Sequence, residues 1–212
     1  MHRFLKSVLD AIFPPHKDVA ASGAITEEQI LALVSPKEGA HPWIHSLLPY
    51  SDPRVRALIR SIKYYNDRHL LPVVGKMGAT YIEEEVADLV TLSGWHTIIL
   101  TPIPGAPNRL RERGYNQAER IAEAIAKEID VSIQYVPGVL GRHNRESQVR
   151  VHKNKREENI SGAFFVLKPD VVHGTCIILI DDVTESGGTL ADARRALMEA
   201  GATDVLGIAL AH

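Results

Sequence analysis

The sequence predicts an α/β fold in which helices flank a mainly parallel, twisted sheet. Two observations carry this prediction. Strand-like apolar runs alternate along the 212 residues with segments whose apolar side chains recur at helical spacing. The run 176–180 is apolar at every position, which is typical of a parallel strand covered on both faces. Alternating strands and helices of this kind pair in parallel through helical crossovers.

Composition excludes several functional classes. The chain carries 24 Lys and Arg against 26 Asp and Glu, a net charge of -2. This balance argues against a protein that coats nucleic acid or membrane over its whole surface, although it leaves room for a local basic patch. Cys176 is the single cysteine. A disulfide framework and a cysteine-rich zinc site are therefore excluded, and a reducing compartment is indicated.

The N-terminal segment raises the question of targeting. Apolar residues between positions 4 and 12 fall at helical spacing, but Lys6 and Asp10 interrupt them and no small-residue cleavage site follows. This pattern favours a short docking helix over a signal peptide. Since no run approaches the roughly 20 apolar residues of a membrane span, we expect a cytoplasmic protein without a membrane partner.

Residues 1–45 are predicted to form a helical appendage with a linker, and residues 46–212 are predicted to form a second, larger domain. Prolines and glycines break up the segment 14–42. Within it, Thr26 and Gln29 have the spacing of a capping box and precede apolar residues, which predicts one short helix.

Two helices are predicted to open the larger domain. Asp52 and Pro53 supply an N-cap and a first helical residue. The expected buried stripe of this helix comprises Val55, Leu58, Ile59 and Ile62. A second helix is predicted from about residue 70 to residue 90, although Gly75 and Gly78 weaken the prediction because glycine is a poor helix former.

Strands and helices alternate from residue 95 onward. The predicted strands are 96–100, which ends at Thr101-Pro102, then 132–136, 163–167, 176–180 and 205–211. The predicted helices are 116–129 and 189–200. Residues 141–160 contain almost no apolar side chains and predict a loop.

The sharpest signal for function follows the apolar run 176–180. Asp181 and Asp182 stand at its carboxyl end, where open α/β sheets bind ligands, and Ser-Gly-Gly-Thr at 186–189 then leads into a helix. Glycines let backbone N–H groups approach an anion closely, and a helix N-terminus favours negative charge. The pattern predicts a phosphate held by the turn, with carboxylates beside it for sugar hydroxyls or a hydrated metal ion. A plain turn with an N-cap is the alternative interpretation.

Residues 177–189 resemble the motif with which type I phosphoribosyltransferases bind phosphoribosyl pyrophosphate (PRPP). Further segments resemble the ComF family of competence proteins, in the order that this family has. They are 47–50, VRALIRSIKYY at 55–65, PIPGAPNRLRERGYNQ at 102–117, Gln148, and REENISGAF at 156–164. The resemblance covers about residues 46–212 and implies the type I phosphoribosyltransferase fold, with a mobile hood loop over the site.

The chain departs from the ComF pattern at two places. Many members carry an N-terminal four-cysteine zinc module, whereas this chain has no cysteine before Cys176, so zinc is not expected. Glu185 stands where the family usually has a neutral hydroxyl residue. In the 6-oxopurine phosphoribosyltransferases, which share this loop, the matching acidic residue exchanges a proton with the purine. The resemblance thus implies a general base at Glu185; the alternative is a side chain turned to solvent or onto Arg113.

The resemblance also implies a role for the other parts of the site. Asp181 and Asp182 are expected to bind the ribose hydroxyls and, mainly through ligand and water, the cofactor Mg²⁺; with Glu185 they form the expected catalytic set. The residues expected to bind PRPP and its 5′-phosphate are Val183, Thr184, Ser186, Gly187, Gly188 and Thr189. The expected pyrophosphate loop comprises Thr101, Pro102, Ile103 and Pro104, continued by Gly105 and Ala106, with Arg113 preferred over Arg109 and Arg111 as its cation. The expected hood loop, or otherwise a solvated connector, carries Arg150, Lys153, Lys155 and Arg156.

Three functions are consistent with these residues. The first is Mg²⁺-dependent transfer of a 5-phosphoribosyl group between PRPP and a small-molecule nitrogen acceptor in nucleotide metabolism, with Glu185 favouring a purine-like base. The second is a ComF-like competence protein for DNA uptake that binds single-stranded DNA, with Tyr64, Tyr65 and Tyr115 available for stacking. The third is a PRPP-sensing protein without turnover. The acceptor is not specified by the sequence, and a monomer or homodimer is expected.

Overall fold

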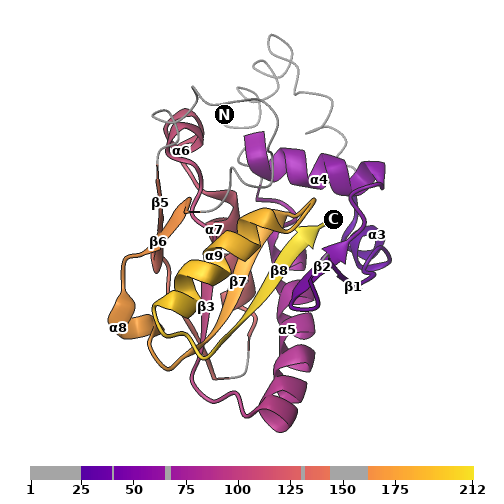
Figure 1. Cartoon of the computed structure of the whole chain (residues 1–212). Coiled ribbons are helices and arrows are strands. Elements are labelled where there is room, and N and C mark those ends of the chain that lie inside the picture. Colours follow the sequence, from indigo (N-terminus) through magenta and orange to yellow (C-terminus); the bar gives the residue numbers. More distant parts are fainter. Residues whose placement is uncertain (1–24, 40, 65–67, 130–131, 144–161) are drawn as a thin grey trace.

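A six-stranded sheet forms the centre of the structure, a computed structural model that describes residues 25–39, 41–64, 68–129, 132–143 and 162–212 (Figure 1). In the order in which they pair, the strands are β1 (Lys37–Glu38), β2 (Ile44–Leu48), β8 (Asp204–Ala211), β7 (Cys176–Val183), β3 (Ile98–Pro102) and β4 (Ile133–Tyr135). All neighbouring strands run parallel except β1, which is antiparallel to β2. The predicted α/β fold with a mainly parallel sheet is confirmed.

Helices cover both faces of this sheet (Figure 1). One face carries α3 (Glu27–Leu31), α4 (Pro53–Tyr64), α5 (Leu71–Ser93) and α7 (Gln117–Ala126). The other face carries α9 (Gly188–Glu199). Two further short helices are α6 (Pro107–Arg113) and α8 (Pro169–Val172). Within the described parts of the chain, none of these helices combines the length and the apolar character that a membrane crossing requires.

The sheet divides the apolar core into two clusters. Ile178 and Ile180 of β7 lie in the cluster with α4, α5 and α7, whereas Ile177 and Leu179 lie in the cluster with α9. Side chains of a strand alternate between the two faces of a sheet, and here both faces are covered. This two-sided burial explains why the run 176–180 contains no polar residue.

Helix starts follow the predicted signals. The backbone N–H of Arg54 donates to Asp52 Oδ1 at 2.8 Å, so Asp52 caps α4 as expected. The four residues predicted for the buried stripe of α4 are at most 2% exposed. Thr26 and Gln29 form the predicted capping box at the start of α3.

The glycines that weakened the prediction of α5 mark its closest contact. α5 runs without a break through Gly75 and Gly78 and packs on α7. A Cβ atom added at Gly75 would lie 2.5 Å from the carbonyl oxygen of Ala124, and one at Gly78 would lie 2.7 Å from Ile125. These positions lack side chains because the two helices approach each other there, so the packing compensates for the low helix propensity.

Several predicted boundaries were wrong. The helix predicted over 116–129 ends at Ala126, and the loop predicted over 141–160 begins with part of a strand, β5 (Leu140–Arg142), paired antiparallel with β6 (Phe164–Val166). β2 and α6 were not predicted. β2 is only five residues long, and its partner β8 comes from the other end of the chain.

The division of the chain into 1–45 and 46–212 stays a prediction. β2 spans the boundary between these two parts. The expected N-terminal helix over 4–12 lies outside the described residues.

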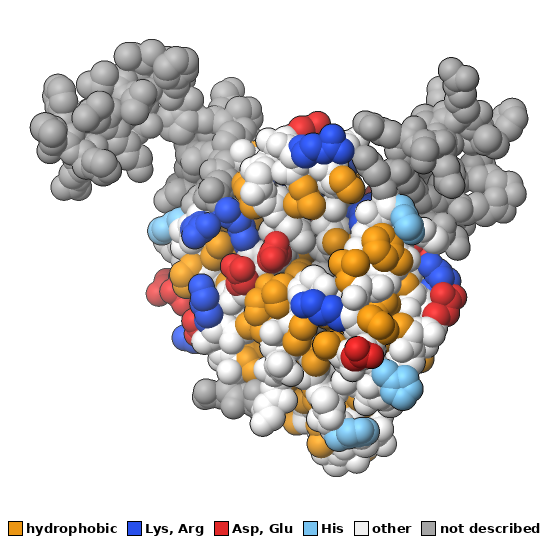
Figure 2. All heavy atoms as spheres, turned by 90° about the vertical axis from the view of Figure 1, so that its left-hand side faces the viewer, with side chains coloured by type: hydrophobic (Ala, Val, Ile, Leu, Met, Phe, Trp, Pro, Cys, Tyr) orange, Lys and Arg blue, Asp and Glu red, His pale blue; other side chains and the backbone are white. Residues whose placement is uncertain are grey.

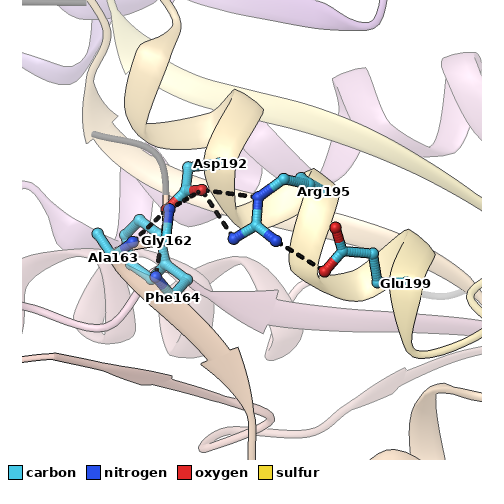
Figure 3. A network of polar contacts seen from close by, with 6 residues as sticks. All are labelled: Gly162, Ala163, Phe164, Asp192, Arg195 and Glu199. Atoms are coloured by element: carbon cyan, nitrogen blue, oxygen red, sulfur yellow. Dashed lines mark hydrogen bonds and ion pairs between the residues drawn. The ribbon is translucent and has the colours of Figure 1, made fainter. Parts of the chain in front are cut away.

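A buried carboxylate joins this small second sheet to α9 (Figure 3). Asp192 of α9 accepts hydrogen bonds from the backbone N–H groups of Gly162, Ala163 and Phe164 at 2.8, 2.7 and 3.2 Å. Arg195, one turn further along α9, forms an ion pair with the same carboxylate at 2.9 Å. Burial raises the pKa of Asp192, but these hydrogen bonds outweigh it, so the pKa lies below its ordinary value.

We expect Asp192→Asn to lower the free energy of unfolding by about 3 kcal/mol near neutral pH, because three N–H groups and Arg195 lose a charged acceptor. A lowered pKa contributes stability that is present above the unfolded-state pKa and lost as the pH falls through the folded-state pKa. The difference from wild type, measured by urea unfolding, therefore narrows below about pH 4.

Glu199→Gln is the matched control for Asp192→Asn. Glu199 also pairs with Arg195, at 2.7 Å, but its side chain is 64% exposed. We expect it to change the free energy of unfolding by no more than about 0.5 kcal/mol. Equal losses from the two variants would show that the buried network contributes nothing beyond a surface ion pair.

Candidate functional site

The connections of β3 and β7 place a crevice between their carboxyl ends. β3 leads through α7, on one face of the sheet, to β4, and β7 leads through α9, on the opposite face, to β8. Chains that leave two adjacent parallel strands in opposite directions open a crevice at the carboxyl ends, where α/β proteins bind ligands. β3 ends at Pro102, which pairs with Ile180, and β7 continues to Val183. The loops after β3 and β7 therefore lie at the same edge of the sheet.

A cavity of about 490 Å³ occupies this position. It brings together residues from α4, the loop after β3, α6, the start of α7, β5, and the turn between β7 and α9. The lining residues are Lys63, Ile103, Pro104, Gly105, Ala106, Arg109, Leu110, Arg113, Tyr115, Asn116, Gln117, Ala118, Arg142, Asp181, Asp182, Val183, Thr184, Glu185, Ser186, Gly187, Gly188 and Thr189. Of the predicted site residues within the described ranges, Thr101 and Pro102 do not line it, because both are buried in β3.

The acid pair belongs to β7 itself. The strand continues three residues past the apolar run, so Asp181 and Asp182 lie within it rather than after it. Each carboxylate accepts a hydrogen bond of 2.8 Å from the backbone N–H of the next residue. Burial raises the pKa of Asp181 well above its ordinary value, and the neighbouring charge of Asp182 raises it further.

Lys63 forms an ion pair with Asp182, and sequence reasoning missed this contact. Its Nζ lies 3.0 Å from Asp182 Oδ2, and the two side chains are only 19% and 15% exposed. Lys63 belongs to the last turn of α4 and lies far from the acid pair in the sequence. The only available signal was its place in the ComF-like segment 55–65, which indicated no role for the lysine.

The glycine turn has the geometry that an anion requires. Gly187 has φ of 77°, a conformation that favours glycine, and it is the N-cap of α9. A Cβ atom at this position would lie 2.7 Å from Ile44 of β2. No side chain caps the first turn of α9, whose N–H groups have no partner within the helix. The turn that lines the cavity is therefore a helix N-terminus suited to a phosphate.

The loop after β3 is held from both sides. The backbone N–H of Ile103 donates to the carbonyl of Ile180 at 2.9 Å, and the Asn116 side-chain amide donates to the carbonyl of Ile103 at 2.8 Å. Residues 103–106 line the same cavity as the glycine turn. Backbone segments that follow two adjacent strands are thus brought to one cavity.

Arginines supply further positive charge. Arg109, Arg113 and Arg142 line the cavity, whereas Arg111 does not. Arg113, the preferred cation of the sequence analysis, lies over the ring of Tyr64 at 4.7 Å from its centroid. Arg142 of β5 lowers the pKa of Asp181, which opposes the effect of burial. The predicted hood residues Arg150, Lys153, Lys155 and Arg156 lie outside the described residues.

Three polar residues of the segment 112–117, called the ERGYNQ segment here, hold backbone carbonyls. The Tyr115 hydroxyl donates to the carbonyl of Ile62 at 2.8 Å, and the Gln117 amide donates to the carbonyl of Lys63 at 3.5 Å. Together with Asn116, these residues connect the last turn of α4 and the loop after β3 to the start of α7. They line the cavity, but no signal in the sequence indicated this supporting role.

The donors present can accommodate a hydrated magnesium ion. In the described parts of the chain, no cluster of three or more His, Cys, Asp or Glu side chains is placed to hold a metal ion alone. Two carboxylates next to an anion-binding turn fit Mg²⁺, which keeps several waters and is commonly bound through one or two carboxylates plus the phosphates of a substrate. Asp181 and Asp182 would hold it from the protein side.

The face of the molecule that carries β5 and β6 has no field of a single charge sign. Figure 2 shows this face, where apolar, acidic and basic side chains are interspersed. Phe165 and Leu167 are 38% and 55% exposed. The mixture of both charge signs on this face is consistent with the net charge of -2 of the whole chain.

A mainly parallel sheet flanked by helices, with an acid pair and a glycine turn at the carboxyl end of a central strand, is the α/β architecture that the sequence predicted. Two solved structures show low similarity: an allosteric regulatory enzyme of purine biosynthesis, with TM-score 0.42 and 18% identity, and a glutamine PRPP amidotransferase from B. subtilis, with TM-score 0.40 and 19% identity. Each comparison covers 71% of this chain and 30% of the other.

The predicted resemblance to the ComF competence proteins is confirmed. The chain is 39% identical over 103 residues to competence protein ComFC of Bacillus subtilis, and 31% identical over 130 residues to ComFC of Streptococcus pneumoniae. These matches cover 49% and 61% of this chain, but only 39% and 52% of the two relatives. No family model matches the chain. The roles assigned to individual site residues stay predictions.

We expect Asp181→Asn to stabilise the free protein, relative to wild type, increasingly as the pH rises above about 4. A raised pKa in the folded state means that the unfolded chain releases the proton first, so ionisation of Asp181 favours unfolding as the pH rises. Asparagine cannot ionise. Urea unfolding without divalent cations should show a gain of about 1 kcal/mol or more by about pH 8.

Asp88→Asn removes an exposed carboxylate from α5 and serves as the control. Its stability should follow the wild-type pH dependence. A constant difference between Asp181→Asn and wild type across this pH range would contradict the raised pKa of Asp181.

Proposed function

We propose that this chain binds PRPP in the cavity between β3 and β7 and, with Mg²⁺, transfers its 5-phosphoribosyl group to a nitrogen acceptor. The observation that supports this most is that one cavity joins the acid pair, the glycine turn at the start of α9 and the loop 103–106. A phosphorylated sugar with a second anionic group needs two anion sites and groups that accept hydrogen bonds from its hydroxyls. The lining of the cavity includes candidates for each of these parts.

Each wall of the cavity has a role in this proposal. The turn 185–189 holds the 5′-phosphate with the backbone N–H groups at the α9 N-terminus. Asp181 and Asp182 accept hydrogen bonds from the ribose hydroxyls. The loop 103–106, with Arg109 and Arg113 nearby, holds the diphosphate. When bound, Mg²⁺ would neutralise charge on the departing diphosphate.

The proposed reaction exchanges one bond for another at the anomeric carbon. The bond from this carbon to the diphosphate oxygen breaks, and the diphosphate leaves with the electron pair. The acceptor nitrogen forms the new carbon–nitrogen bond and gives its proton to Glu185. Glu185 is exposed and lines the cavity between Thr184 and Ser186, within the turn. Because this base suits a protonated ring nitrogen, a purine-like heterocycle is the proposed acceptor.

Single-stranded DNA is a second candidate ligand. The curated relatives are named competence proteins. Tyr64 is 60% exposed beside the cavity residue Lys63, and Arg113 lies on its ring, which gives a base a stacking surface near a phosphate site. A third alternative, PRPP sensing without turnover, uses the same cavity.

We expect PRPP with Mg²⁺ to stabilise the wild-type protein. At about 100 times its dissociation constant, a ligand adds about 2.7 kcal/mol, which raises the midpoint of thermal unfolding by roughly 5 to 10 °C. The double variant Asp181→Asn, Asp182→Asn should fold and lose this rise, because it keeps the side-chain shapes but removes the carboxylates. Thermal unfolding with and without PRPP measures both effects, with Asp88→Asn as control.

The outcomes separate the candidates. No stabilisation of wild type by millimolar PRPP excludes both the enzyme and the sensor. Stabilisation without product from any nitrogen acceptor identifies a sensor. Binding of single-stranded DNA that weakens steeply with salt and is unaffected by the double variant identifies the DNA-binding protein.

We expect Glu185→Gln to reduce turnover with a purine-like acceptor by about 100-fold while PRPP affinity is retained, because general base catalysis is worth about this much. Steady-state kinetics and calorimetric titration with PRPP measure the two quantities. Glu199→Gln, far along α9, is the control and should match wild type. Turnover of Glu185→Gln within about twofold of wild type would show that Glu185 is not the general base, and the argument for a purine-like acceptor would then fail.

A further inference from the structure

In the free protein, the Lys63 ammonium lies beside Asp182, at the position proposed for the Mg²⁺ that accompanies the substrate. Lys63 reaches from α4 to Asp182 of β7, across the cavity wall, and its ammonium lies in direct contact with the acid pair at 3.0 Å. An ion pair with both side chains at least four-fifths buried carries a desolvation cost that its Coulomb attraction only partly offsets. A ligand that offers a new partner to each of the two charges can therefore replace this ion pair.

The position of Lys63 is fixed by its surroundings rather than by the ion pair alone. The carbonyls of Ile62 and of Lys63 itself accept the hydrogen bonds from Tyr115 and Gln117. Ile62 is 2% exposed and anchors the same turn in the core. The Lys63 backbone therefore stays in place if its ammonium leaves Asp182, and the flexible side chain can then reach another anion.

The charges of the cavity set the conditions for such an exchange. The Lys63 ammonium and the Asp182 carboxylate, 3.0 Å apart, compensate each other's charge in the free protein. An approaching polyanion would be repelled by an uncompensated carboxylate at this distance. A ligand that carries Mg²⁺ presents a divalent cation to Asp182 and an anionic oxygen to Lys63, so each charge of the pair gains a new partner.

We infer that Lys63 is a resident counter-cation, which stands in for the metal ion at Asp182 in the free protein and passes to a phosphate oxygen of the ligand when Mg²⁺ and PRPP bind. This inference rests on the proposed function. It explains why the lysine is held at the end of a helix braced by the ERGYNQ segment. It also gives Lys63 a second role, which is to allow the diphosphate to bind when magnesium is scarce.

Amine labelling of the wild-type protein tests the exchange directly. An ammonium held against a carboxylate is labelled slowly, and mass spectrometry reports each lysine separately. Mg²⁺ alone should increase the labelling of Lys63 by about threefold or more, because the metal ion takes its place at Asp182, and PRPP with Mg²⁺ should reverse the increase. Lys76, exposed on α5, is the internal control and should not change.

Variants test the consequence for affinity. Calorimetric titration with PRPP in a chelator should show a loss of about tenfold or more for Lys63→Gln, and at saturating Mg²⁺ a loss of no more than about threefold. Lys63→Arg keeps the charge and should stay within about threefold of wild type in both conditions, and Lys76→Gln should match wild type.

The outcomes distinguish this inference from the function it rests on. If wild type does not bind PRPP with Mg²⁺, both are overturned. If wild type binds PRPP but Mg²⁺ leaves the labelling of Lys63 unchanged, or Lys63→Gln loses equal affinity with and without Mg²⁺, only the exchange is overturned and the ion pair is structural. Because labelling uses the wild-type protein, a Lys63→Gln variant that does not fold leaves the test intact.

Discussion

The pairing of β3 with β7 is the constraint on which the site depends. Their parallel register brings Pro102 level with Ile180, and their chains leave toward opposite faces of the sheet. The pairing accounts for one loop from each strand, the first turns of α7 and α9, and the crevice between them. The apolar run 176–180 contributes to both core clusters because both of its faces are buried.

The electrostatics of the cavity are balanced in the absence of a ligand. Two adjacent ionised carboxylates in a partly buried strand repel each other and lose hydration. Burial and the charge of Asp182 raise the pKa of Asp181, and Lys63 forms an ion pair with Asp182. A few residues further along the chain, the turn before α9 presents N–H groups that no side chain caps. The site therefore combines carboxylates with an anion-binding turn, which suits a ligand that carries both hydroxyls and phosphate groups.

The residues that make the ERGYNQ segment recognisable are mostly structural. Similarity to ComFC connects the chain with competence proteins, over about half of its length. The geometry shows that within the ERGYNQ segment the tyrosine, asparagine and glutamine hold backbone carbonyls, while Arg113 stacks on Tyr64. The most recognisable segment outside the acid pair is thus largely scaffolding for the cavity. A specific motif need not consist of residues that touch the ligand.

Elements with strong local signals could be predicted from the sequence alone. Apolar patterns predicted α9 and β8 to within one residue at each end, a capping residue predicted the start of α4, and the apolar run predicted the start of β7 but not its last three residues. The acid pair with its glycine turn was identified from the order of residues. The short β2 and the small sheet of β5 and β6 were missed wholly or in part, because their stability comes from partners distant in the sequence. Only the tertiary structure decided that Gly75 and Gly78 are packing positions, that Asp192 holds β6, and that Lys63 meets Asp182. Such contacts join residues far apart in the chain, and no local propensity records them.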